Sequence, residues 1–126
     1  MQPIQLFALA SRQAEWLSVR QSVVSSNVAN ANTPGFAAKD VTPFQAVLDQ
    51  TDMPMARTNP AHFAGSQTEE MGIRVRPDED ALALVSGNSV DLAEQLMKQG
   101  QIKREYEINT GVVKAFNKLM LLTVRR

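Results

Sequence analysis

The sequence predicts a mainly α protein in which long N- and C-terminal helices pair as an antiparallel-type coiled coil. Two observations carry this prediction: apolar residues recur at helical spacing in both terminal regions, and prolines and glycines interrupt the residues between them. The middle segment should therefore hold at most short helix or strand pieces. We expect one structural unit with a coiled-coil arm at 1–36, an irregular acidic connecting segment at 37–87 and a second coiled-coil arm at 88–126.

The N-terminal arm is predicted to be one helix over about residues 4–31. Its weaker second apolar row includes Trp16, which either packs within the chain or contacts an adjacent subunit. A helix with two apolar faces needs more than one neighbour. It would be about 42 Å long, which is natural for a fibrous subunit. Its main seam alternates spacings of three and four residues and consists of Phe7, Ala10, Ala14, Leu17, Gln21, Val24, Val28 and Ala31.

The first helix must stop before Pro34 and Gly35. Proline disfavours the helical region for the residue before it, and glycine accepts positive φ. Asn27, Asn30 and Asn32 suit such a terminus, because their amides can bond backbone groups that lack helical partners. An ordinary helix end followed by a Pro-Gly turn would use the same residues.

The connecting segment at 37–87 offers little material for chemistry. Its pattern favours a helical turn at 44–48 and a short strand at 73–76. His62 is the only histidine and cysteine is absent, so neither a metal cluster nor a nucleophilic site has suitable residues. The acidic runs at 69–70 and 78–80 lie in loop-like surroundings, which would not separate the pKa values of their carboxyl groups. We expect no enzyme activity, no metal and no cofactor.

The C-terminal arm predicts a helix over about residues 90–124, with Asn88 as its N-cap and Asp91 in its first turn. Gly100 and Gly111 fall inside this helix, where each costs about 1 kcal/mol relative to alanine. We attribute them to a neighbouring helix that approaches closely or to a bend. The predicted seam consists of Leu92, Leu96, Gln99, Ile102, Tyr106, Asn109, Val113, Phe116, Met120 and Val124.

Charge and composition exclude several classes of partner. Thirteen basic and thirteen acidic side chains cancel, which argues against a nucleic-acid or anionic-membrane binder. No apolar run is long enough to span a bilayer, so we expect no direct membrane insertion. The N-terminus lacks the basic start and continuous apolar core of a cleavable signal peptide, so any export would need a dedicated machine.

Two motifs carry a family resemblance. The run Asn-Val-Ala-Asn at 27–30, followed by Asn-Thr-Pro-Gly-Phe at 32–36, resembles the N-terminal signature of the rod and hook proteins of the bacterial flagellum. The run Gly-Asn-Ser-Val-Asp-Leu at 87–92, with Tyr106 and the closing Leu-Met-Leu-Leu at 119–122, is similar to the C-terminal region of the rod proteins. The short chain looks most like the proximal members of the family, although Glu-Ile-Asn at 107–109 looks as much like the distal pattern.

The resemblance implies a structural subunit of the proximal rod of the flagellar basal body, part of the periplasm-spanning axle that transmits motor torque. The implied partners are other copies of the subunit, other flagellar rod proteins, and basal-body and export-gate components, reached without a cleavable signal peptide. A cytoplasmic helical adapter or export chaperone that binds a partner helix is the alternative. The residues expected at the assembly interface are Phe7, Leu17, Val24, Val28, Asn27, Asn30, Asn32, Thr33, Pro34, Gly35, Phe36, Ile102, Tyr106, Val113, Phe116 and Met120.

Overall fold

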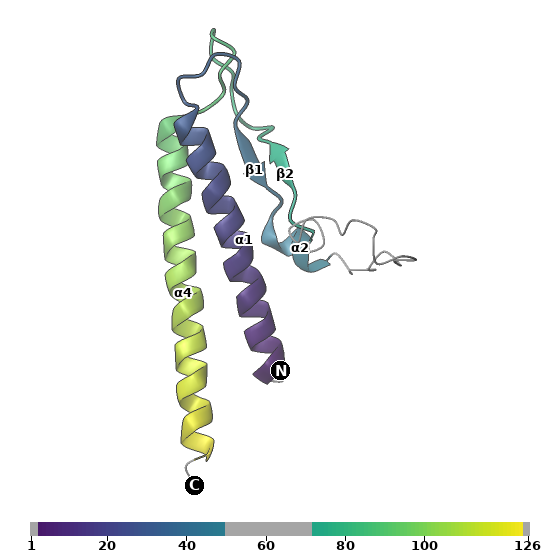
Figure 1. Ribbon diagram of the computed structural model, residues 1–126, viewed down its shortest axis with the longest axis vertical. Helices are drawn as coiled ribbons and strands as arrows, with labels where there is room; N and C mark the ends of the chain where they lie inside the picture. The colour runs from purple at the N-terminus through teal and green to yellow at the C-terminus, as the bar shows by residue number, and fades with distance from the viewer. Residues whose placement is uncertain (1–2, 50–71, 125–126) are drawn as a thin grey trace, which may run out of the picture.

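The computed structural model describes residues 3–49 and 72–124 of the chain. Helix α1 (Pro3–Ala29) and helix α4 (Leu92–Val124) run antiparallel to each other, so both chain ends lie at the same end of an elongated hairpin (Figure 1). Between them come strand β1 (Lys39–Val41), helix α2 (Phe44–Asp49) and strand β2 (Val75–Pro77). The predicted mainly α fold, with short helix and strand pieces in the middle, is confirmed.

The two long helices pack through apolar side chains along their facing seams. Leu17 and Val24 of α1 are each 1% exposed, and Ile102 of α4 is 4% exposed. Burying a side chain of this size contributes about 1.5–3 kcal/mol relative to leaving it in water. Nearer the open end of the hairpin, the rings of Phe7 and Phe116 meet edge to face with their centroids 5.6 Å apart.

The seam of α4 is more polar than the sequence pattern indicates. Gln95 and Asn109 are buried, whereas Leu92 and Leu96, which were predicted to lie in the seam, are 48% and 56% exposed. The buried row of α4 therefore begins at Gln95 and continues through Ile102 to Asn109, at intervals of seven residues. The polar members are stable there because they are hydrogen-bonded within the hairpin.

The second apolar row of α1 packs against the short strands and α2. Trp16 is 6% exposed, its Nε1 donates to the Thr42 carbonyl oxygen at 2.8 Å, and its ring lies 5.7 Å from that of Phe44. Of the two alternatives for Trp16, the structure shows packing within the chain. The other buried apolar residues on this side of α1 are Val41, Val47 and Ile73, which come from the segment between the two long helices.

The strands pair antiparallel, with Asp40 opposite Arg76. The predicted strand at 73–76 is found at 75–77, and β1 was not predicted, because three residues with one buried apolar side chain carry no alternating pattern. The start of α4 also differs from prediction. Asp91 is the N-cap, since its Oδ1 accepts from the Ala93 amide at 2.9 Å, and Asn88 lies before the helix.

Candidate assembly site

Asn27 ties three segments together from the last turn of α1. Its side chain is fully buried; Oδ1 accepts from the Lys39 amide at 3.0 Å, and Nδ2 donates to the Lys39 carbonyl oxygen at 2.7 Å. Nδ2 also lies 2.9 Å from Oε1 of Gln95 on α4. The amide pairs with the first residue of β1 much as a neighbouring strand would. A side chain that lacks either the donor or the acceptor would leave buried groups unpaired.

The Asn88 side chain binds the turn that follows α1, although the two are far apart in the sequence. Its side chain is 2% exposed, and Oδ1 accepts from the Val90 amide at 2.7 Å. The carbonyl groups of the turn that follows a helix also need hydrogen-bonding partners. Nδ2 lies 2.9 Å, 3.1 Å and 2.7 Å from the carbonyl oxygens of Asn30, Ala31 and Thr33. The prediction that Asn88 caps the second helix was therefore wrong: its side-chain amide instead binds the turn that follows the first helix.

Gly35 and Gly87 bring the two turns at the closed end of the hairpin into backbone contact. Both have positive φ, +72° and +75°, which glycine adopts without steric cost. The Gly35 amide donates to the Ser86 carbonyl oxygen at 3.0 Å. A Cβ at Gly87 would lie 3.3 Å from the Gly35 Cα. The Thr-Pro-Gly turn thus fastens the first helix to the start of the second within one chain.

The residues predicted for the assembly interface fall into two groups. Four of them are buried inside the chain's own fold and present no surface in this conformation: Leu17, Val24, Asn27 and Ile102. The others are partly or fully exposed: Phe7, Val28, Asn30, Asn32, Thr33, Pro34, Gly35, Phe36, Tyr106, Val113, Phe116 and Met120. The first group holds the hairpin together, so among the predicted residues only the second group can present a surface to a second chain.

One side of the hairpin is an open groove. The strands cover the side of α1 that carries Trp16 and Asn27. On another side, two depressions between α1 and α4, of 390 Å³ and 790 Å³, share Tyr106 in their linings. The smaller one is lined partly by Phe7 and the larger partly by Gly100. Together these two depressions form the open groove, which is mostly apolar and lies between α1 and α4.

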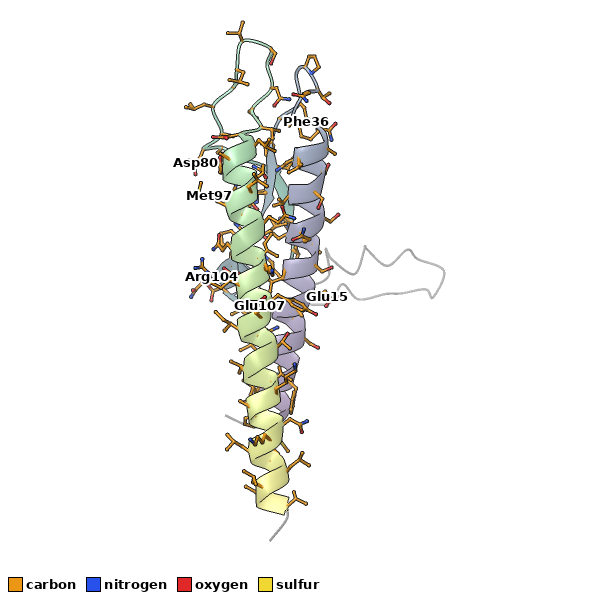
Figure 2. All side chains as sticks on the ribbon, turned by 90° about the vertical axis from the view of Figure 1, so that its left-hand side faces the viewer. Glu15, Phe36, Asp80, Met97, Arg104 and Glu107 are labelled. Atoms are coloured by element: carbon orange, nitrogen blue, oxygen red, sulfur yellow. The ribbon has the colours of Figure 1, made fainter. Side chains whose placement is uncertain are left out.

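Many exposed side chains of α4 are large and apolar. Figure 2 shows Met97 and Arg104 on the flank of α4 away from α1, and Met97 is 70% exposed. An outward helix face in water normally carries polar side chains. The large apolar side chains of α4 that are between 46% and 79% exposed are Leu92, Leu96, Met97, Tyr106, Ile108, Val112, Leu119, Leu121, Leu122 and Val124.

A charged cluster joins the strands to both helices, and sequence reasoning missed it. Lys98 Nζ lies 2.6 Å from a carboxylate oxygen of Asp78, 2.9 Å from Glu94 and 3.1 Å from Asp40. Arg20 Nε on α1 lies 3.3 Å from the other Asp40 oxygen. The Glu94–Lys98 spacing of four residues was the only local signal; the remaining partners are distant in sequence.

The cluster makes stability depend on pH at both extremes. Burial raises the pKa of Asp40, but the Val41 amide, Lys98 and Arg20 outweigh it and hold that pKa below its usual value of 3.8. The contribution of Asp40 is therefore present above about pH 4 and is lost as pH falls through the lowered pKa. Burial lowers the pKa of Lys98, but its three carboxylate partners outweigh it and raise that pKa above its usual value of 10.5. The contribution of Lys98 is therefore fully present below about pH 10.5 and is lost as pH rises through the raised pKa.

We expect Lys98→Met to lower the free energy of unfolding by about 2 kcal/mol at neutral pH, because three carboxylates would then face one another without their shared cation. The midpoint of thermal loss of helicity, measured by circular dichroism in a stabilising osmolyte, checks this. Asp40→Asn should weaken the loss of stability at acidic pH and leave the loss at alkaline pH unchanged. An unchanged midpoint for Lys98→Met would contradict the role of the cluster.

The described residues offer no other chemical centre. Within 3–49 and 72–124, no group of three or more His, Cys, Asp or Glu residues is placed to hold a metal ion. Neither long helix has an apolar stretch sufficient to cross a membrane in the part of the chain that was described. His62 and the acidic pair at 69–70 lie outside the described residues.

The hairpin and its interlocking turns define an elongated helical protein of structural type. Residues 9–36 match the family described as Flagella basal body rod protein. The chain is 57% identical, over its full length and 97% of the relative, to Flagellar basal body rod protein FlgB of Agrobacterium fabrum. It is 30% identical to FlgB of Borrelia hermsii over 82% of the chain and 84% of the relative, and 34% identical to FlgB of Aeromonas hydrophila over 71% and 70%.

The chain therefore belongs to the FlgB family of flagellar basal body rod proteins. It is a structural component of the proximal rod of that basal body. The predicted family is confirmed, as is the choice of its short proximal members over the distal ones.

Proposed function

We propose that the subunit polymerises through its terminal helices, with other copies and with other rod proteins, into the periplasm-spanning axle that transmits motor torque. The observation that supports this most directly is the composition of α4, which buries Gln95, partly buries Lys98, and leaves Leu92, Leu96 and Met97 exposed. Such a helix is stable in water only when another element covers its outer face. The role is mechanical, without catalysis.

Coupling of folding to assembly follows from the same surface. A subunit that completes its apolar burial only against neighbours gains much of its stability on assembly. A loosely ordered free chain also suits passage through a narrow export gate, so we include the flagellar type III export gate and other basal-body components among its partners. No cleavable signal peptide is needed for that route.

The open groove is the proposed lateral interface. Gly100 and Gly111 lie on α4, and a Cβ built on either has no atom within 4 Å, so no helix within residues 3–49 and 72–124 accounts for them. We assign the role of Gly100 to a helix of the neighbouring subunit, which could approach closely there in the wider depression. Tyr106 and Phe7 would form the apolar floor of that contact.

The isolated chain tests this function. In dilute buffer without osmolyte, we expect a circular dichroism spectrum of low helicity, because the outer face of α4 and the groove are uncovered. Fractionation of cells should place the same chain in purified basal bodies. A cooperative helical melt of the dilute chain, together with its absence from basal bodies, would instead favour a cytoplasmic helical adapter or export chaperone.

A further inference from the structure

Helix α4 is anchored in the hairpin along only part of its length. Within the described residues, the buried side chains of α4 are Gln95, Ile102 and Asn109. The last of these, Asn109, donates from Nδ2 to the Ala10 carbonyl oxygen at 2.9 Å. None of the described residues at 110–124 is buried. The buried contacts that fix α4 to the rest of the hairpin therefore end at Asn109.

The part of α4 beyond this anchor, its end segment at 114–124, packs weakly against α1. The rings of Phe116 and Phe7 meet edge to face with their centroids 5.6 Å apart, but Phe7 is 36% exposed and Phe116 is only partly buried. The last turns of the helix then extend past the start of α1 (Figure 1). A helix this short is marginally stable without tertiary packing. The direction of the end segment is therefore set mainly by the helix backbone that joins it to the anchor.

The joining stretch, residues 109–113, has the lowest helix propensity in α4. It reads Asn-Thr-Gly-Val-Val, and all five residues rank below leucine, lysine and glutamate as helix formers, with glycine the lowest. Threonine and valine lose side-chain freedom in a helix, and glycine loses the most backbone freedom. The segments on either side consist mostly of strong helix formers. The helix is continuous through this stretch, but it opens here at the lowest cost.

Packing does not explain Gly111. Within residues 3–49 and 72–124, a Cβ built on Gly111 has no heavy atom within 4 Å, and Gly111 lies outside the linings of both depressions of the open groove. The neighbouring helix assigned to Gly100 therefore does not account for Gly111. At such an open position, what glycine still does is lower the stability of the helix around it.

We propose that residues 110–113 form a hinge in α4, about which the end segment changes direction while the part of the helix before it keeps its contacts. The hinge lies directly after the anchor, so opening it breaks helical backbone bonds and leaves Asn109 bound to Ala10. Local opening occurs where buried contacts are few. An end segment that turns in this way can meet neighbours in more than one direction. The hinge is a property of the single chain and does not depend on the proposed polymerisation.

Distances between paired spin labels test the hinge, because the natural chain contains no cysteine and the labels attach only at introduced ones. Ser25→Cys with Ile108→Cys reports on the anchored part, and Ser25→Cys with Leu122→Cys spans the hinge; all three positions are exposed. Electron paramagnetic resonance would be recorded on the dilute full chain, folded in osmolyte. We expect one narrow distance for the first pair and two populations of distances for the pair that spans the hinge.

Alanine substitutions then locate the movement. In the pair that spans the hinge, Gly111→Ala should reduce the second population about fivefold, the factor by which a helix favours alanine over glycine. Gly100→Ala is the matched control, because the same methyl group enters open space in the same helix but within the anchored part; it should leave the second population unchanged. Asn117→Ala, in the end segment, controls for fraying of the helix end and should also leave that population unchanged.

Each other result would overturn the hinge. A single narrow distance for the pair that spans it would show that the end segment keeps one direction. Broad distances for both pairs would show that the movement does not begin at 110–113. Equal reductions by Gly111→Ala and Asn117→Ala would identify fraying of the helix end, and equal reductions by Gly111→Ala and Gly100→Ala would identify a general gain in helix stability. The presence of the chain in basal bodies tests the rod function separately.

Discussion

Asn27→Leu is expected to lower the free energy of unfolding of the hairpin by about 4 kcal/mol, the largest loss among its single side chains. Leucine branches at the same carbon but carries no polar atom, so it would leave the Lys39 amide, the Lys39 carbonyl and the Gln95 side chain without the partners they have at 2.7–3.0 Å. Each buried polar group left unpaired costs about 1–3 kcal/mol. The thermal midpoint in osmolyte and the amount of the variant in basal bodies both measure the loss.

Asn32→Leu is the matched control for this substitution. Asn32 belongs to the same asparagine-rich stretch but is exposed, so the same change there should alter the free energy of unfolding by no more than about 0.5 kcal/mol. Equal losses for the two variants would show that asparagine is needed for the helix end as such. The hydrogen bonds of Asn27 to Lys39 and Gln95 would then not be the cause of the lost stability.

The contrast between these asparagines shows what local sequence reasoning can reach. The spacing of small and polar residues before Pro34 placed the helix end within two residues of Ala29, because proline and glycine act on their own neighbourhood. It could not show that Asn27 bonds Lys39 and Gln95. Those partners are 12 and 68 residues away, and only the folded hairpin brings them together.

The predicted seam of α4 was partly wrong for a related reason. Periodicity assigns apolar residues to the buried face, so it selected Leu92 and Leu96. In the structure, Gln95 and Lys98 occupy that face, because Asn27 and the carboxylate cluster supply them with hydrogen-bonding partners from other elements. The displaced leucines are then exposed. A surface that serves a second chain is where the sequence pattern of a single chain is expected to mislead.

Gly87→Ala and Gly100→Ala are expected to change stability in opposite directions, although the chemical change is the same. At Gly87 the φ of +75° disfavours alanine by about 1–2 kcal/mol. The added Cβ would also lie 3.3 Å from the Gly35 Cα, so one of the two turns must move. We expect a total loss of about 2–4 kcal/mol and separation of the closed end of the hairpin.

At Gly100 the same methyl group enters open space on a helix, where alanine is favoured over glycine by about 1 kcal/mol. The isolated Gly100→Ala chain should therefore melt at a higher temperature in osmolyte than the parent. Its incorporation into basal bodies should nevertheless fall, because the methyl group would occupy the place proposed for the neighbour's helix. Greater stability with unchanged incorporation would show that no helix approaches closely at Gly100, and would move the lateral interface out of the groove.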